Sequence, residues 1–268
     1  MVEIIIAFLA GLLIGSFLNV CVYRLPLEIS VAQPARSFCP GCEKTIAWYD
    51  NVPVLSFLLL RGRCRNCKAR IPLRYPVVEL ATGLAFALCV AAFGVTLLTV
   101  KYAILSAILI TLIATDFEEH FLPDEFTLGG TLIGLVLAVF IRMDPGIVNL
   151  LMPYSLSWRW VSLAESAFSA AFFSGIVWFA GWLYEKVRHR EGMGLGDVKM
   201  LAMVGAFLGT TGSQLTLIIG GVFGVILGGG YILIAREKAS EYELPYGSFL
   251  GFGAFVAVGM WYFQQYRH

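Results

Sequence analysis

Residues 4–23 have the sequence IIIAFLAGLLIGSFLNVCVY, which carries no charge between Glu3 and Arg24. A helix of these 20 residues is long enough to cross the hydrocarbon core of a bilayer, which is about 30 Å thick. A cleavable secretion signal would begin with basic residues and end in small ones, whereas this segment follows an acid and ends at an arginine. We therefore expect a first membrane-spanning helix here.

The composition of the whole chain agrees with a location in the membrane. Of the 268 residues, 59% are hydrophobic and only 14% are charged, whereas soluble proteins average about 25% charged residues. The net charge of +1 gives no concentrated basic surface, so nucleic acid is not an expected partner. The composition thus argues against a soluble enzyme and against a nucleic-acid-binding protein.

Further uncharged stretches provide the remaining candidate spans. They cover residues 80–100, 102–115, 126–141, 166–184, 200–235 and 244–266. The stretch 200–235 is too long for one crossing and contains a polar, glycine-bearing break at 209–214, so it predicts two helices. Residues 80–115 predict a helical hairpin that turns near Gly94. The sequence therefore predicts an all-α polytopic membrane protein with about eight transmembrane helices.

The basic residues predict the orientation of these helices. If the first helix enters the membrane from the extracytoplasmic side, most of the 19 lysines and arginines fall in cytoplasmic segments. Cytoplasmic loops of membrane proteins carry such an excess. We therefore expect both termini on the extracytoplasmic side and the long polar insert after the first helix on the cytoplasmic side.

This insert, residues 26–76, has the polarity of a small soluble domain. It contains two Cys-x-x-Cys motifs, and four thiolates at this spacing can surround Zn²⁺ tetrahedrally. Disulfides are disfavoured in a reducing cytosol, and a thioredoxin-like redox unit needs more than the roughly 50 residues available. We expect a structural zinc site that the insert needs in order to fold. Its ligands would be Cys39, Cys42, Cys64 and Cys67.

The expected organisation therefore has three parts. Residues 1–25 form the first transmembrane helix, residues 26–76 form the zinc-binding insert, and residues 77–268 form a membrane core of about seven helices. The insert is rich in basic residues, for which contact with anionic lipid headgroups is the simplest explanation.

Two aspartates lie at the cytoplasmic ends of predicted spans. Asp116 follows an apolar stretch, and Asp197 follows the glycine-rich sequence Gly-Met-Gly-Leu-Gly. A carboxylate at such a depth is a functional candidate, because its burial is costly. Two of them at the same depth can form a catalytic pair in which one acid stays protonated while the other activates water. They could equally cap helices at the interface, and these residues alone leave both interpretations open.

Other hydrolytic sites are not indicated. The sequence contains no His-Glu-x-x-His motif and no Gly-x-Ser-x-Gly motif, and no dinucleotide fingerprint follows a predicted strand. A metalloprotease, a serine hydrolase of the α/β type and a Rossmann enzyme are therefore not expected.

Seven motifs follow one another along the chain. They are Gly15-Ser-Phe-Leu-Asn-Val20 with Arg24-Leu-Pro26, the two Cys-x-x-Cys pairs on either side of the next motif, Asn51-Val-Pro53, then Arg74-Tyr-Pro-Val-Val-Glu-Leu80, Asp116-Phe-Glu-Glu-His-Phe-Leu-Pro-Asp124, Glu191-Gly-Met-Gly-Leu-Gly-Asp-Val-Lys199 and Pro245-Tyr-Gly247. In this order, and over nearly the whole chain, they resemble the bacterial type IV prepilin peptidases. One departure is visible, because the family's late Pro-Phe-Gly-Pro is Pro-Tyr-Gly-Ser here, ending at Ser248.

The resemblance implies an aspartic endopeptidase of the Gly-x-Gly-Asp type, with Asp116 and Asp197 as catalytic residues. It implies cleavage of the basic leader of type IV prepilins and pseudopilins, after a glycine, at the cytoplasmic face of the bacterial inner membrane. Family members with the cysteine-rich insert also methylate the new N-terminal residue, so S-adenosylmethionine is an implied cofactor beside Zn²⁺.

The loop after Asp116 is acidic and contains no lysine or arginine. A solvated turn would explain it, and Asp124 could cap the next helix or compete with Asp116 for the first catalytic position. The apolar span beside Asp116 favours Asp116. We hypothesise that the acidic loop attracts the basic leader. The candidate substrate-binding residues are Glu118, Glu119, Asp124, Gly194, Gly196 and Lys199.

Two other functions fit parts of the sequence. A carboxylate-coupled ion transporter would use both aspartates, but it favours acids near the bilayer midplane. A zinc-ribbon membrane adaptor without catalysis would leave the glycine-rich stretch before Asp197 unexplained. The oligomeric state, and the pilin system that the protein serves, are left open by the sequence.

Overall fold

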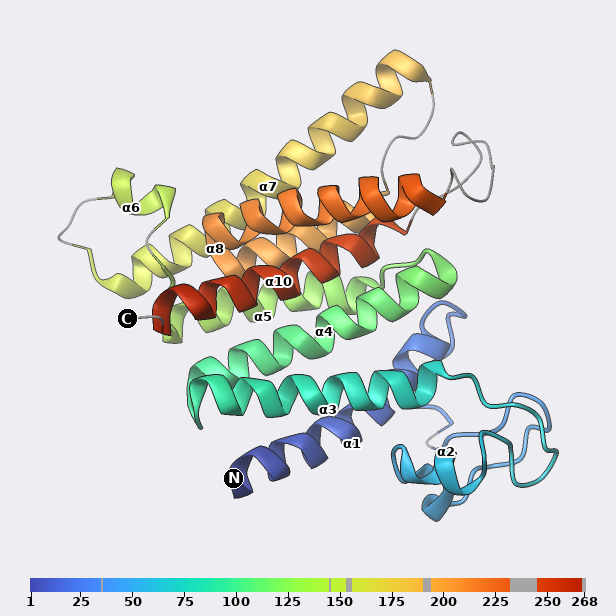
Figure 1. Cartoon of the computed structure of the whole chain (residues 1–268). Helices are drawn as coiled ribbons and strands as arrows, with labels where there is room; N and C mark the ends of the chain where they lie inside the picture. The colour runs from blue at the N-terminus through green and yellow to red at the C-terminus, as the bar shows by residue number, and fades with distance from the viewer. Residues whose placement is uncertain (35, 145, 153–155, 190–193, 232–244, 267–268) are drawn as a thin grey trace. The chain divides into compact units, whose positions relative to one another are not determined.

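A computed structural model of the chain describes residues 1–34, 36–144, 146–152, 156–189, 194–231 and 245–266. Within these residues the structure is helical apart from loops and two isolated β-bridges in the insert. The chain divides into two compact units, Met1–Thr115 and Asp116–His268. The all-α fold predicted from the sequence is confirmed (Figure 1).

The long helices follow the apolar stretches of the sequence. They are α1 (Val2–Arg24), α3 (Arg74–Phe93), α4 (Leu97–Glu119), α5 (Asp124–Phe140), α7 (Trp158–Arg188), α8 (Leu195–Phe223) and α10 (Tyr246–Tyr266). The short elements are η1 (Trp48–Asn51), α2 (Leu55–Leu59), α6 (Ile147–Leu151) and the π-helical η2 (Gly224–Gly228). The predicted turn near Gly94 is confirmed, because α3 ends at Phe93 and α4 begins at Leu97.

Six helical stretches among the described residues are long and apolar enough to cross a membrane. One of them, Leu195–Tyr231, has 37 residues and is broken internally. The helix α5, with 17 residues, is shorter than the other spans. Counting α5 and both parts of the broken stretch separately, the described residues contain eight helices that follow the predicted spans, which agrees with the number expected from the sequence.

The break predicted at 209–214 lies at Gly209. This residue has φ +67° and ψ −168°, a backbone conformation that glycine adopts readily and L-residues rarely do. A Cβ there would also lie 3.0 Å from Cε of Met143. The helix α8 therefore consists of two halves that meet at Gly209. This agrees with the two helices expected for residues 200–235, of which the structure describes those up to Tyr231.

A buried glutamate of α7 holds this break. The carboxylate of Glu165 accepts hydrogen bonds of 3.1 Å from the backbone N–H groups of Thr210 and Val148, and a further bond from the Thr210 hydroxyl. The N–H groups at the start of a helix have no partner within it, so a carboxylate placed there stabilises the helix. Glu165 thus connects α7 with α6 and with the second half of α8.

Replacing Glu165 by alanine should strongly destabilise the second unit. The change leaves two buried backbone N–H groups unsatisfied, at a cost of about 1–3 kcal/mol each. The thermal unfolding midpoint of the detergent-solubilised protein should fall accordingly. Glu185→Ala, which changes an exposed glutamate of the same helix, should unfold like the wild type. Equal midpoints for the two variants would contradict the role of Glu165.

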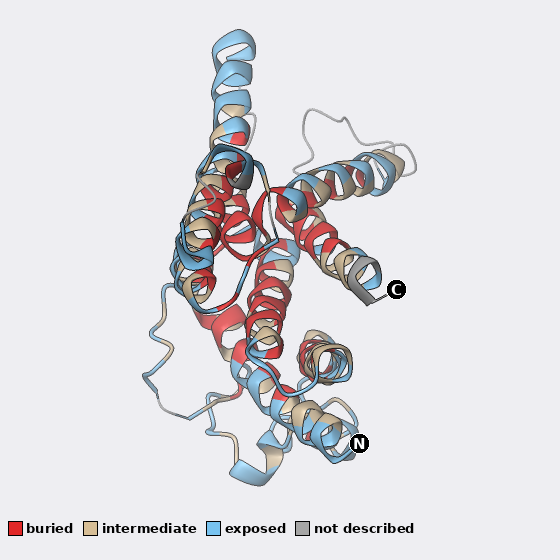
Figure 2. Ribbon diagram, turned by 90° about the vertical axis from the view of Figure 1, so that its left-hand side faces the viewer, coloured by how far each residue is buried: buried red, intermediate tan, exposed pale blue. Residues whose placement is uncertain are grey.

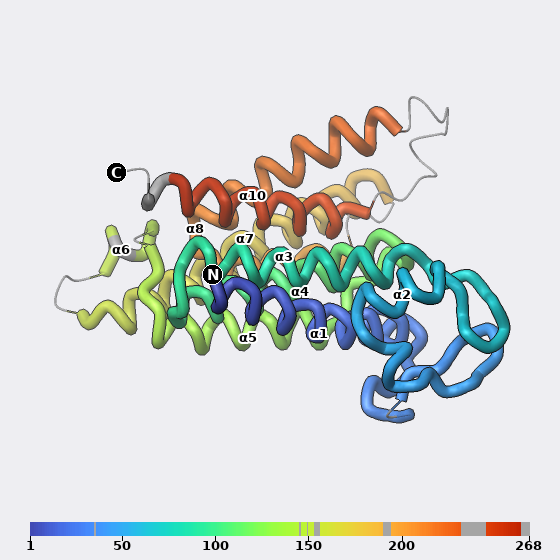
Figure 3. Tube along the Cα trace, turned by 60° about the horizontal axis from the view of Figure 1, so that its bottom comes forward, coloured from blue at the N-terminus to red at the C-terminus, as the bar shows by residue number. Residues whose placement is uncertain are grey.

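In the first unit, α1 and α3 pack closely along glycines (Figures 1 and 3). A Cβ at Gly11 would lie 2.7 Å from Cα of Gly83, and one at Gly15 would lie 2.8 Å from Cα of Glu79. Small residues allow such close approach of membrane helices. The helices run antiparallel, and their contact continues toward the insert, where Asn19 donates a 3.0 Å hydrogen bond to the carbonyl of Tyr75.

In the second unit, the first half of α8 is the most deeply buried element. Met200, Leu201, Met203, Val204 and Phe207 are fully buried. Figure 2 shows buried residues where neighbouring helices face each other and exposed residues on the outer sides. Many exposed side chains of the long helices are large and apolar, as expected for surfaces that contact lipid.

Candidate active site and metal centre

Asp116 is buried in the last turn of α4 and contacts the start of α10. The backbone N–H of Ser248 donates a 2.6 Å hydrogen bond to Oδ2 of Asp116, and the Ser248 hydroxyl donates a 2.8 Å bond to the same oxygen. Ser248 lies in the first turn of α10, where backbone N–H groups lack partners within the helix. Two donors therefore fix the orientation of this carboxylate.

Asp197 lies in the first turn of α8 and is partly buried. It lies near Asp116 and near the side chain of Tyr246. The structure thus brings together two aspartates that are about 80 residues apart in the sequence. Both belong to the second unit.

Glycines lie beside both carboxylates. A Cβ at Gly247 would lie 3.1 Å from Cγ of Asp116, and one at Gly194 would lie 3.7 Å from Oδ2 of Asp197. A Cβ at Gly196 would lie 3.1 Å from the side chain of Leu122. At Gly196 and Gly247, the absence of a side chain lets the backbone lie against Leu122 and Asp116. The first part of the glycine-rich motif, residues 191–193, lies outside the described residues.

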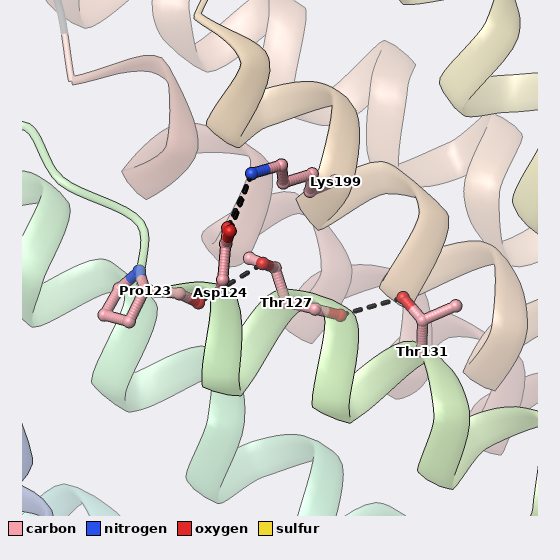
Figure 4. A network of polar contacts seen from close by, with 5 residues as sticks. All are labelled: Pro123, Asp124, Thr127, Thr131 and Lys199. Atoms are coloured by element: carbon pink, nitrogen blue, oxygen red, sulfur yellow. Dashed lines mark hydrogen bonds and ion pairs between the residues drawn. The ribbon is translucent and has the colours of Figure 1, made fainter.

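Asp124 and Lys199 form an ion pair between the N-terminal ends of α5 and α8 (Figure 4). The Lys199 ammonium donates to both oxygens of Asp124, at 2.7 and 2.9 Å. Below it, the hydroxyls of Thr127 and Thr131 donate to backbone carbonyls one turn earlier. Asp124 therefore has a cationic partner and a solvent-exposed position, in contrast to the buried Asp116.

The remaining candidates of the acidic loop, Glu118 and Glu119, are exposed in the last turn of α4. Two contacts of the site were missed by the sequence analysis, those of Ser248 and Tyr246. The available signal was the departure from the family motif at Ser248, which the sequence analysis did not connect with Asp116.

The four cysteines of the insert form a second site, in the first unit. Their Sγ atoms all lie within 4.8 Å of one another, and those of Cys39 and Cys67 are 3.7 Å apart. An isolated bridge flanks each pair, Phe38 with Thr45 and Arg63 with Arg70. This group could hold a metal ion, and four thiolates are a ligand set that suits Zn²⁺.

The backbone prepares part of this sulfur cluster for metal binding. Backbone N–H groups of Cys67 and Asn66 lower the pKa of the Cys64 thiol to about 6, which favours the thiolate. Burial raises the pKa of the Cys39 thiol to about 11, and a bound cation would favour its thiolate.

Two arginines hold segments of the insert in place, one from the end of α1 and one from within the insert. Arg24, buried at the end of α1, donates hydrogen bonds to the carbonyls of residues 30, 31, 34 and 36. Arg65 binds both carboxylate oxygens of Asp50, at 2.6 and 2.7 Å, and this contact lowers the pKa of Asp50. Arg65 thereby connects the second cysteine pair with η1.

Comparisons with known proteins identify the family to which the two parts of the chain are similar. Residues 9–93 match the model of the bacterial peptidase A24 N-terminal domain, and residues 103–229 match that of the type IV leader peptidase family. No solved structure matches the chain significantly.

Several curated relatives are named "Prepilin leader peptidase/N-methyltransferase". The relative from Pseudomonas putida is 33% identical over 95% of this chain and 90% of its own length. That from Klebsiella pneumoniae is 39% identical over 79% of this chain and 88% of its own length. That from Myxococcus xanthus (strain DK1622) is 40% identical over 75% of this chain, which spans 55% of the relative. The chain therefore belongs to the type IV leader peptidase family.

Proposed function

We propose that the protein cleaves the leader of type IV prepilins and pseudopilins after a glycine and methylates the new N-terminal residue. As a member of its family the chain is a peptidase, and the names of its relatives support an associated methyltransferase activity. The observation that carries the proposal is the placement of Asp116 and Asp197 near each other within one unit, with glycines beside both carboxylates.

In the proposed mechanism the two aspartates share one proton, because like charges at close range cannot both be present. The ionised member takes a proton from water as the water oxygen attacks the scissile carbonyl carbon. The protonated member donates a hydrogen bond to the developing oxyanion. Collapse of the tetrahedral intermediate breaks the C–N bond, and the leaving amine takes up a proton from the pair. Because the pair titrates as a unit, neither residue is named as the acid.

Ser248 serves this mechanism by occupying Oδ2 of Asp116. The other carboxylate oxygen, Oδ1, then faces the water. Gly194 and Gly196 would lie along the extended substrate, whereas Lys199 and Asp124 would contact the leader through their exposed ion pair. Incubating the purified protein with a prepilin, with and without S-adenosylmethionine, and weighing the products tests the proposal. An unchanged substrate mass would refute the proposal and favour the alternative functions, an ion transporter or a zinc-ribbon adaptor.

The acidic loop gives a more specific prediction. Since Lys199 balances the charge of Asp124, attraction of the basic leader depends on Glu118 and Glu119. Replacing both by glutamine should raise KM about threefold to tenfold at low salt with little change in kcat, and salt should affect the wild type more than this variant. Glu185→Gln removes an exposed acid elsewhere and serves as the control. An unchanged KM in the double variant would refute the role of the loop.

The proposed cofactors are Zn²⁺ and S-adenosylmethionine, as expected from the sequence. Zn²⁺ held by Cys39, Cys42, Cys64 and Cys67 would support the fold of the insert, because a site with four protein ligands has no position for substrate. S-adenosylmethionine would supply the methyl group. We propose that the chain is organised into a first helix (1–25), an insert (26–76) and a protease core (77–268).

We also propose the bacterial inner membrane as the location. The insert and the two aspartates would lie on the cytoplasmic side, where the basic insert contacts anionic lipid, and both termini would lie on the other side. A reporter fused after the C-terminus that is active only in the cytosol would refute this orientation.

A further inference from the structure

A cluster of buried polar groups lies in the first unit, where α1 meets α3 near the insert. Its members are Asn19 of α1, which is 1% exposed, and Glu79 of α3, which is 7% exposed. Both belong to helices that are long and apolar enough to cross a membrane. Polar side chains in such helices are costly to bury and mark candidate functional sites.

The amide of Asn19 is only half satisfied. Its Nδ2 donates hydrogen bonds to the carbonyls of Gly15, at 3.3 Å, and Tyr75, at 3.0 Å. Its Oδ1 is buried and accepts no hydrogen bond from the described residues. A buried acceptor without a donor costs about 1–3 kcal/mol, so this oxygen is suited to receive a donor from a ligand.

Glu79 presents a second acceptor. Its Oε2 accepts a 2.7 Å hydrogen bond from the backbone N–H of Val54, and the carboxylate also contacts the hydroxyl of Ser16. In the part of the chain that the structure describes, no lysine or arginine forms an ion pair with Glu79. A carboxylate buried without a cation is strongly disfavoured, so a positive charge beside Glu79 would be stabilised.

The two acceptors lie one helical turn apart along the contact between α1 and α3. Gly15 packs against Cα of Glu79, whereas Asn19 is bonded to Tyr75. Asn19 and Tyr75 are each one helical turn from these packing partners, which corresponds to about 5–6 Å along the axis. The two side chains therefore belong to neighbouring turns of the same helix contact.

The insert covers this cluster at Val54. This residue has φ +60° and ψ −48°, a conformation that is unfavourable for a β-branched side chain. Its N–H bond to Glu79 stabilises the strained turn. A donor that replaced this N–H would allow the turn to relax, which gives a ligand a route to the carboxylate.

We propose that Asn19 and Glu79 form a binding site for an ammonium group, with the turn at Val54 as its cover. The site offers a negative charge and a neutral oxygen acceptor, and an ammonium supplies a positive charge and three donors. The inference rests on the proposed function, which provides two molecules with such a group. These are the N-terminal residue freed by cleavage and the amino-acid end of S-adenosylmethionine.

Binding calorimetry on the detergent-solubilised full chain tests the site without an activity readout. The probes are a peptide with the free N-terminal phenylalanine of a cleaved pilin, the same peptide N-acetylated, and S-adenosylmethionine. One of these ligands is expected to place its ammonium group in the site. Glu79→Gln should lower the affinity for that ligand about tenfold or more. The acetylated peptide should bind weakly to both proteins. If the variant loses affinity for the free peptide, the N-terminal amine of the pilin is the ligand. If it loses affinity for S-adenosylmethionine, the methyl donor is the ligand.

Glu3→Gln is the matched control, because it removes an exposed carboxylate from α1 and should bind all probes like the wild type. Since Glu79→Gln also loosens the turn at Val54, Asn19→Ala provides a second variant that keeps the carboxylate. Asn19→Ala should lower the affinity for the same ligand about threefold or more. Wild-type affinity for both ligands in both variants would overturn the site.

The outcome can be separated from that of the proposed function. A wild-type protein that fails to cleave a prepilin refutes the proposed function, and the binding data still report on the ammonium site. A protein that cleaves normally, but whose affinities are insensitive to both variants, refutes the site alone.

Discussion

Asparagine in place of either Asp116 or Asp197 is expected to reduce kcat for prepilin cleavage roughly a thousandfold or more. An amide can neither take a proton from water nor share one with the remaining aspartate. The protein should still insert and fold, because asparagine has nearly the same shape and can still accept the hydrogen bonds that Ser248 donates at position 116.

The measurement is cleavage of a purified prepilin under single-turnover conditions, with the unfolding midpoint as a check on folding. Asp124→Asn tests the rival assignment. Because Asp124 is exposed and paired with Lys199, this variant should keep kcat within about tenfold of the wild type. Loss of cleavage in Asp124→Asn together with full activity in Asp116→Asn would exchange the two roles.

The second large effect is expected from loss of the metal. Replacing one cysteine of each pair, as in Cys39→Ser with Cys64→Ser, should abolish zinc binding and unfold the insert. Structural zinc sites contribute on the order of 10–16 kcal/mol in small zinc-binding peptides, far more than the few apolar contacts of a short insert can replace. A strong chelator should have the same effect on the wild type.

Metal content by mass spectrometry should fall from one zinc per chain to none, and limited proteolysis should cut within 26–76. Cys89→Ala is the control, because Cys89 is buried in α3 and lies outside the sulfur cluster. A double variant that retained its zinc, or an insert that resisted proteolysis without it, would contradict the structural role of the metal.

The positions of the helices could be read from the sequence because lipid excludes charge. The turn at Gly94 and the break at Gly209 were predicted from the same local information, a glycine within a long apolar stretch. The bounds of α7 were not predicted correctly from the sequence. The uncharged stretch 166–184 is contained in a helix that extends from Trp158 to Arg188, since buried Glu165 and the exposed charges of the last turns are compatible with helix.

The site could be predicted only in part. Asp116 and Asp197 stood out because each borders a predicted span and both are expected at the same depth, and the cysteines stood out through their spacing. The partner of Asp116 depends on how α10 packs against the end of α4, which no local pattern encodes. The same holds for the bond between Glu165 and Thr210, and for the ion pair of Lys199 with Asp124.

The contact between Ser248 and Asp116 has a consequence for inhibitor selectivity. One of its two donors belongs to the main chain, so alanine at position 248 would remove only the hydroxyl bond. Proline, which the family motif places there, offers neither donor. A compound that takes over the Ser248 hydroxyl as a partner would therefore bind this protein in preference to family members that keep the proline.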